Sequence, residues 1–365
     1  MEPFRIHFAD EVLDDLRARL RHTRWPEQVP GIGWEQGTEL GWLRRLVSYW
    51  VNEFDWRPWE RKLNALNQFT WDGIHFVHQR AASGRGVPLI LTHGWPSSFL
   101  DYVDMLPMLE DFDVVVPSLP GYGFSPRPPK VGVNYRYVSE RWHRLMTDLG
   151  YSRYGAGGND FGSGVSTFLA VDHPEAVMGI HLTTLESDIA SKVDDAGLSD
   201  MERSYLAVSR GWDLTERGYS AIQSTKPQTV GYGLNDSPAG LAAYLGEKWH
   251  SWSKVTPPDD FLCATLTLYW VTQTITSSMR DYWDNRWYPV EHTYVGTPTA
   301  FGVFAHHTVP EGEPPRSFLE RLYNIQHWTV FPRGGHFAPV EEPAAVAGDL
   351  TAFFRDLSSG HGTVG

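Results

Sequence analysis

The stretch that decides the fold is Gly155-Ala156-Gly157-Gly158-Asn159-Asp160-Phe161-Gly162-Ser163-Gly164. Asp160 has a glycine two residues before it and another two residues after it. This spacing is typical of a nucleophile elbow, a turn between a strand and a helix that is tight enough to strain its central residue. The same composition fits an Asx turn in an ordinary glycine-rich loop, so the rest of the chain must decide between the two.

An aspartate at the centre of an elbow changes the chemistry that the elbow can support. A carboxylate is a nucleophile without the help of a base, but it attacks carbon that carries a good or strained leaving group. Asp160 therefore favours epoxides or alkyl halides as substrates over esters and amides.

Composition limits the classes to which the chain can belong. Its 365 residues are 41% hydrophobic and carry a formal net charge of −13. That length can bury a large α/β core with an inserted lid, and the charge argues against nucleic acid or an anionic membrane as a partner. The single cysteine excludes an internal disulfide and a thiolate zinc cluster. No apolar run approaches the roughly 20 residues of a membrane span, and the charged N-terminus is unlike a signal peptide, so we expect a cytoplasmic protein.

Hydrophobic periodicity predicts an N-terminal helical segment and an α/β core. Residues 1–68 have helical spacing, with helices expected at Asp10–Arg19 and Leu40–Phe54. Beyond them, strands are expected at residues 74–78, 87–92, 114–116, 154–156, 177–185, 299–304 and 328–331, and helices at residues 99–109, 139–149 and 164–171. This alternation predicts a mostly parallel sheet with helices on both faces.

One long interval breaks the alternation. Residues 189–288 contain no clean buried strand and are helix-like and rich in tyrosine and tryptophan. We therefore expect a helical lid at 189–288, inserted into a core made of residues 69–188 and 289–365. The N-terminal segment, residues 1–68, is expected to pack on the core and the lid.

Three loops at the predicted carboxyl ends of strands carry candidate catalytic groups, because function in such a sheet is found at that edge. The backbone N–H groups of Trp95, in His93-Gly94-Trp95-Pro96, and of Phe161, directly after Asp160, can stabilise a developing oxyanion. His336, in Gly334-Gly335-His336-Phe337, follows the last strand and can serve as the base for a water molecule.

Together these motifs resemble the α/β-hydrolase epoxide hydrolases of the microsomal and juvenile-hormone type, over nearly the whole chain. Further segments that carry the resemblance are Trp25-Pro26, Gly33-Trp34, Tyr49-Trp50, Asn52–Trp56, Pro120–Ser125, Thr225-Lys226-Pro227, Asn235–Pro238 and Leu268-Tyr269-Trp270. Membrane-bound members begin with an anchor helix, whereas this chain begins at the N-terminal segment, so it resembles the soluble bacterial members.

The resemblance implies a hydrolase that opens an epoxide to a vicinal diol, without a cofactor or metal ion, in secondary or xenobiotic metabolism. Asp160 resembles the nucleophile that forms an alkyl-enzyme ester, and His336 resembles the base that activates water. Tyr219 and Tyr269 resemble the lid tyrosines that hydrogen-bond the epoxide oxygen. A phenol with a pKa of roughly 10 can donate a proton to the alkoxide that forms. We expect a small, apolar or aromatic epoxide as substrate, and the oligomeric state stays open, a homodimer included.

One residue of the family pattern is missing. The family places a carboxylate shortly after the strand that follows the lid, where it orients the base histidine, but here His307 occupies that position. Four interpretations stay open: an acid at the end of the neighbouring strand, with Glu186 before Asp188; an acid from the next loop, Glu311 or Glu313; His307 itself as the acceptor; or loss of the hydrolytic step. A metal site at His306-His307 is not expected, because adjacent side chains diverge.

Two other functions remain open at this level. Asp160 could attack an alkyl halide in a dehalogenase-type hydrolase, with Trp95 as a donor to the halide. Alternatively, the chain could be a degenerate hydrolase that binds an aromatic ligand without turnover, for which His307 is the only support.

Overall fold

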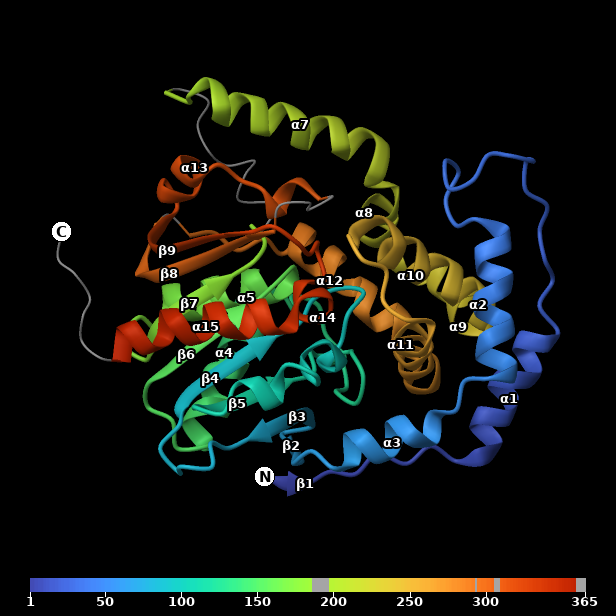
Figure 1. Cartoon of the computed structure of the whole chain (residues 1–365), viewed down its shortest axis with the longest axis horizontal. Helices are drawn as coiled ribbons and strands as arrows, with labels where there is room; N and C mark the ends of the chain where they lie inside the picture. Colours follow the sequence, from blue (N-terminus) through green and yellow to red (C-terminus); the bar gives the residue numbers. More distant parts are fainter. Residues whose placement is uncertain (186–196, 293, 305–308, 359–365) are drawn as a thin grey trace.

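The computed structural model describes residues 1–185, 197–292, 294–304 and 309–358, and a twisted sheet forms its centre (Figure 1). Within these residues the sheet has nine strands in the order β1-β2-β3-β5-β4-β6-β7-β8-β9. The strands are β1 Glu2–Pro3, β2 Gln68–Trp71, β3 Ile74–Gln79, β4 Val87–Thr92, β5 Phe112–Pro117, β6 Tyr154–Gly158, β7 Val177–Leu182, β8 Val295–Phe304 and β9 Tyr323–Phe331. Neighbours from β5 to β9 are parallel and the first three strands pair antiparallel, which confirms a mostly parallel sheet.

The central strands are the most apolar because helices cover both faces of the sheet. Leu89, Ile90 and Leu91 of β4 are at most 1% exposed. Helices α4 (Tyr135–Asp148) and α5 (Phe161–Asp172) cover one face, and α15 (Pro343–Ser358) crosses the other (Figure 1). Short helices α13 (Arg316–Glu320) and α14 (Ala338–Glu341) precede and follow β9. This packing places the ends of β4, β6, β7 and β9 along one edge.

The helix predicted at residues 99–109 is wrong. The segment forms two 3₁₀ turns, η1 (Phe99–Tyr102) and η2 (Leu106–Met108). Pro107 explains the break, since it has no N–H to donate and it disfavours helical geometry in the residue before it. The edge strand β1, its neighbour β2 and the helix α3 (Trp56–Asn64) are further elements that the periodicity did not predict.

Between β7 and β8 the chain forms the helices α7 to α12, which we call the lid. They are α7 Asp200–Glu216, α8 Gly218–Gln223, α9 Pro227–Asp236, α10 Pro238–Trp252, α11 Asp259–Thr272 and α12 Ile275–Trp287. Local signals start some of them; the Ser237 hydroxyl caps α10 by accepting the N–H of Gly240 at 3.0 Å. In the described part of the chain, no helix is both long enough and apolar enough to cross a membrane.

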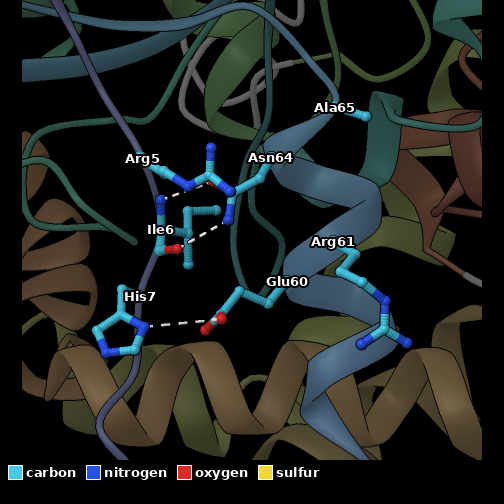
Figure 2. Close-up of a pocket in the computed structure, with 7 residues that line it drawn as sticks. All are labelled: Arg5, Ile6, His7, Glu60, Arg61, Asn64 and Ala65. Carbon is cyan, nitrogen blue, oxygen red and sulfur yellow. Dashed lines mark hydrogen bonds and ion pairs between the residues drawn. The ribbon is translucent and has the colours of Figure 1, made fainter.

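The N-terminal helices α1 (Asp10–Arg21), α2 (Leu40–Asn52) and α3 pack against the lid (Figure 1). The indole N–H of Trp50 donates to the Thr267 hydroxyl at 2.9 Å, and that of Trp59 donates to Asp260 at 2.8 Å. Figure 2 shows a pocket beside α3, where both backbone groups of Ile6 bond the Asn64 amide at 2.8 Å. The two indole bonds therefore join the N-terminal segment to α11, and the bonds of Ile6 hold the segment together.

Candidate active site

Asp160 occupies the turn between β6 and α5 in a strained conformation. Its φ of 52° and ψ of −127° are outside the regions that residues with a side chain usually adopt. The turn closes only because residue 162 is glycine: a Cβ there would lie 1.9 Å from the carbonyl oxygen of Thr92. The backbone N–H of Asp160 donates to the Thr184 hydroxyl at 2.6 Å, which ties the turn to the end of β7. The local structure is that of a nucleophile elbow.

Two backbone N–H groups hold one oxygen of the Asp160 carboxylate. Trp95 N donates to Oδ1 at 2.8 Å, and Phe161 N donates to the same oxygen at 2.7 Å. These are the two groups that the sequence suggests for an oxyanion hole. Gly94 makes room for the carboxylate, because a Cβ at that position would lie 2.3 Å from Oδ1.

The other oxygen of Asp160 faces His336. Its Oδ2 lies 3.6 Å from His336 Nε2. His336 is 3% exposed, and its backbone N–H donates to the Trp252 carbonyl at 3.0 Å. The imidazole also packs against the Trp252 indole, with ring centroids 5.0 Å apart. The two oxygens of one carboxylate are thus in different environments, one held by amides and one beside an imidazole.

The candidates for the acid that orients His336 cannot be compared directly. Glu186, Asp188 and His307 lie outside the described residues, as does the side chain of Glu311. The side chain of Glu313 is exposed. Strands β7 and β8 pair in parallel, so their carboxyl ends lie at the same edge of the sheet.

The two predicted lid tyrosines are in different surroundings. Tyr219 on α8 stacks on the Trp95 indole with centroids 5.5 Å apart, and it meets the Trp252 indole edge to face at 5.2 Å. Tyr269 on α11 is buried, and its hydroxyl donates to the Ser97 carbonyl at 2.9 Å. Burial and the charge of Asp101 raise the pKa of Tyr269 well above its usual value. Tyr219 therefore faces Trp95, whereas the Tyr269 proton is directed at the backbone.

A third tyrosine, absent from the sequence prediction, lies beside Tyr219. Tyr282 on α12 meets the rings of Phe161, Trp95 and Tyr219 edge to face, at 4.8, 5.7 and 5.7 Å. Its pKa is raised well above the usual value by burial, by the charges of Tyr219 and Asp160, and by a hydrogen bond with Tyr219. The sequence contains no signal for Tyr282, because helical spacing does not indicate which face of α12 points at the elbow.

Family models match both the N-terminal segment and the core. Residues 1–102 match the model described as epoxide hydrolase N terminus, and residues 87–213 match the alpha/beta hydrolase fold. The chain is 37% identical, over 97% of its length and 85% of the relative, to a candidate epoxide hydrolase of Stigmatella aurantiaca. It is 33% identical to epoxide hydrolase 1 of Sus scrofa, over 97% of the chain and 88% of the relative. The solved structure of Aspergillus niger epoxide hydrolase superposes with a TM-score of 0.86 at 30% identity, covering 98% of this chain and 96% of that one.

Proposed function

The chain belongs to the epoxide hydrolase family of the α/β-hydrolase fold, and we propose that it opens an epoxide to a vicinal diol through an ester on Asp160. The observation that carries this proposal is the division of the Asp160 carboxylate. Oδ1 accepts two backbone N–H groups, while Oδ2 is directed toward His336. A carboxylate held in this way offers one oxygen for attack and keeps the other where negative charge will later develop.

In the first step, Oδ2 forms a bond to an epoxide carbon and the carbon–oxygen bond of the ring breaks. The released oxygen needs a proton donor. We assign this role to Tyr219 together with Tyr282, since both rings contact Trp95 and a hydrogen bond joins the two side chains. Tyr269 was the other candidate from the resemblance, and its hydroxyl is engaged by Ser97.

In the second step, His336 takes a proton from a water molecule that attacks Cγ of the ester. The charge that forms on Oδ1 is stabilised by the N–H groups of Trp95 and Phe161, which already point at this oxygen. The Cγ–Oδ2 bond then breaks, and Oδ2 leaves in the diol with the proton that His336 had taken from water. A carboxylate that stabilises the His336 imidazolium completes the site, and Glu186 remains our first candidate for it, followed by Asp188.

The aromatic side chains beside Asp160 favour an apolar substrate. The rings of Trp95, Tyr219, Trp252 and Tyr282 pack on one another beside the elbow, where the Trp95 N–H bonds Asp160. Such rings contribute apolar area with few polar groups, which suits an alkyl or aryl epoxide.

An isotope experiment tests the ester. Enzyme in excess over a styrene-oxide-type epoxide is allowed one turnover in ¹⁸O-water, and the diol is analysed by mass spectrometry. We expect an unlabelled diol, because its new oxygen comes from Asp160 Oδ2, and label in the carboxylate of the enzyme. Label mainly in the diol would mean that water attacks the epoxide directly.

The step assigned to His336 has its own test. His336→Gln should open the epoxide once and accumulate an adduct one substrate heavier than the chain, seen by intact-protein mass spectrometry. A separate Glu186→Gln variant should accumulate the same adduct, whereas a His307→Gln variant should not. The reverse pattern would place His307 in contact with His336.

The proton donors are separated by three phenylalanine variants. Tyr219→Phe and Tyr282→Phe should each slow adduct formation by about 10- to 100-fold, the size of one acid contact, and the double variant should abolish it. Tyr269→Phe should leave the adduct rate close to that of the parent. If Tyr269→Phe is slow and Tyr282→Phe is fast, the original assignment holds and ours fails.

A dehalogenase reaction at Asp160 is the second candidate, and one observation favours it. The indole N–H of Trp95 is buried without a hydrogen-bond partner among the described residues, and a halide leaving group would accept such a donor. Halide release from a primary alkyl bromide, measured beside epoxide turnover, decides between the two reactions.

A further inference from the structure

A buried lysine lies beside the site, and the mechanism above does not use it. Lys248 on α10 is 6% exposed. Its ammonium nitrogen lies 4.4 Å from the centroid of the Tyr219 ring and 5.4 Å from that of the Trp252 ring. It also pairs with Glu247 at 2.5 Å, and the Glu247 side chain remains 20% exposed. A buried ammonium is costly to desolvate, so its position over a lid tyrosine calls for a physical explanation.

A cation over a phenol ring favours the ionised phenol. The negative face of an aromatic ring attracts a cation, and the attraction reaches about 2 kcal/mol when both partners are desolvated. A phenolate spreads negative charge into its ring, so the attraction increases when Tyr219 gives up its proton. An interaction that grows during the reaction lowers the barrier, whereas one of constant strength does not.

The surroundings of Tyr282, in contrast, disfavour the ionised phenol. Burial, the charges of Tyr219 and Asp160 and the hydrogen bond with Tyr219 all favour its neutral form. The surroundings of the two tyrosines therefore differ, because an ammonium lies over the Tyr219 ring while the contacts of Tyr282 favour its neutral form.

We propose that Lys248 assists epoxide opening through Tyr219, by stabilising the tyrosinate that forms when Tyr219 protonates the epoxide oxygen. Tyr282 stays neutral and only donates a hydrogen bond. The inference rests on the proposed function, because it requires an epoxide that opens at Asp160. In this step the Oδ2–carbon bond forms, the ring carbon–oxygen bond breaks, and the released electron pair takes the Tyr219 proton. After ester hydrolysis Asp160 is left as a carboxylic acid, and its proton returns to the tyrosinate, so the cycle balances.

Other ionisable groups surround this pair and must be considered in any pH profile. Glu247 neutralises part of the Lys248 charge from the same helix. Asp160 at the elbow opposes ionisation of the tyrosines, as the raised pKa of Tyr282 indicates. His336 contacts Trp252, the second ring that the Lys248 ammonium faces. Because the Lys248 ammonium contacts the Tyr219 ring, its removal should make Tyr219 lose its proton less readily.

The test uses Lys248→Met, which keeps the length of the side chain and removes the charge. It is made in the full chain with His336→Gln, where adduct formation reports epoxide opening alone. We expect adduct formation to slow by about 30-fold near neutral pH, the equivalent of about 2 kcal/mol. The alkaline ionisation that limits the rate should move to higher pH, because Tyr219 without the cation holds its proton more tightly. Lys248→Arg keeps a cation over the ring and should restore most of the rate and the original profile.

Lys130 offers a matched control, since its ammonium lies 4.0 Å from the ring of Tyr137 on α4. Lys130→Met removes the same kind of contact at an exposed position and should leave both rate and profile unchanged. A double-mutant cycle shows whether the effect passes through Tyr219. In a Tyr219→Phe background, Lys248→Met should cause little further loss.

Three results would overturn the inference. One is an adduct rate and pH profile in Lys248→Met equal to those of Lys130→Met. A second is a full additional loss in the Tyr219→Phe background, which would mean that Lys248 acts elsewhere. Both leave the ester on Asp160 intact, so they differ from a failure of the proposed function, which the isotope experiment detects. The third is a Lys248→Arg variant that folds normally by circular dichroism but forms the adduct slowly. If Lys248→Met does not fold, Lys248→Gln takes its place in every comparison.

Discussion

At the scale of single residues, the site depends on how little room surrounds one carboxylate. Asp160 is held in a left-handed conformation that costs about 1–3 kcal/mol, and in this conformation the carboxylate oxygens have fixed partners while the side chain stays 18% exposed. Both amides that hold Oδ1 belong to the backbone, so their position depends on the shape of two turns rather than on any side chain. The chemistry therefore depends on glycines that contact no substrate.

Gly94→Ala tests this dependence. The new Cβ would be 2.3 Å from Asp160 Oδ1, so either the carboxylate or the turn must shift. A displacement of about 1 Å costs on the order of 100-fold in rate, and we expect that loss in adduct formation with His336→Gln, measured by quenched-flow mass spectrometry. Gly348→Ala, on α15 with open space around the position, is the control and should react normally. A Gly94→Ala variant with the control's rate would show that the turn is adaptable.

The predicted site residues that the structure brings together are those that follow strands. Asp160, Trp95, Phe161 and His336 follow β6, β4 and β9, and parallel topology alone brings such positions together. The lid tyrosines are different, because their direction depends on how the lid helices rotate against the core. Tyr269 was chosen by resemblance and its hydroxyl bonds Ser97, while Tyr282 was missed.

At the scale of elements, the helix that carries Tyr282 is tied to the core by a buried arginine. Arg127, 3% exposed in its side chain, pairs with Asp281 at 2.6 Å and with Asp284 at 2.5 Å. It also donates to the Ser277 carbonyl at 2.8 Å. Burial raises the pKa of Asp281 to about 6, even with the arginine charge beside it. One cation therefore compensates two carboxylates of α12.

Arg127→Met should destabilise the protein and also disturb Tyr282. Loss of the cation leaves buried carboxylates without compensation. Breaking a buried pair typically costs about 3–5 kcal/mol, and we expect the free energy of unfolding in urea to fall by that amount. We expect adduct formation to slow as well, since α12 carries Tyr282. Arg280→Met removes an exposed arginine of the same helix, bonded to Gln228, and should do neither. A stable Arg127→Met variant would mean that packing alone positions α12.

A second buried network fixes α15 to the face of the sheet opposite α4 and α5. Asp349 bonds His181 Nε2 at 2.8 Å, His327 Nε2 at 2.7 Å and the Thr329 hydroxyl at 2.6 Å. Burial alone would raise the pKa of Asp349, but the bonds from His181, Thr329 and His327 hold it below its usual value of 3.8. The network joins β7 and β9 through one carboxylate.

The direction of that pKa predicts a pH dependence. A carboxyl with a lowered pKa in the folded state contributes stability above its usual pKa, and loses it as pH falls through the acid range. Asp349→Asn should therefore lower stability by about 3 kcal/mol near pH 7, as expected for a buried pair with one partner removed. The difference from the parent should shrink below pH 4. Urea unfolding at a series of pH values measures this, with Asp104→Asn at an exposed ion pair as control. A constant difference at every pH would show that shape, not charge, is responsible.

At the scale of the whole molecule, the N-terminal segment contacts the lid helix that carries residues beside the site. Helices α1 and α2 contact α10 and α11, and α10 carries Lys248 and Trp252. The stacked rings of Trp34 and His250, with centroids 3.7 Å apart, join the same two parts. We expected the N-terminal segment to pack on the core and the lid, but the sequence did not indicate which helices would meet, because an amphipathic pattern does not identify the partner of a helix.

Trp50 tests whether the N-terminal segment and the lid are stable only together. Trp50 is 1% exposed on α2, and its indole donates to Thr267 on α11. Trp50→Ala removes that bond and leaves a cavity, at a cost of about 3–5 kcal/mol. If the two parts form one unit, hydrogen exchange should accelerate in α10 and α11 as well as in α2, while β4 and β6 stay protected. Trp287→Ala, at a position 55% exposed, is the control. Faster exchange confined to residues 1–68 would show that the lid is held by the core alone, and the position of Lys248 over Tyr219 would then owe nothing to the N-terminal helices.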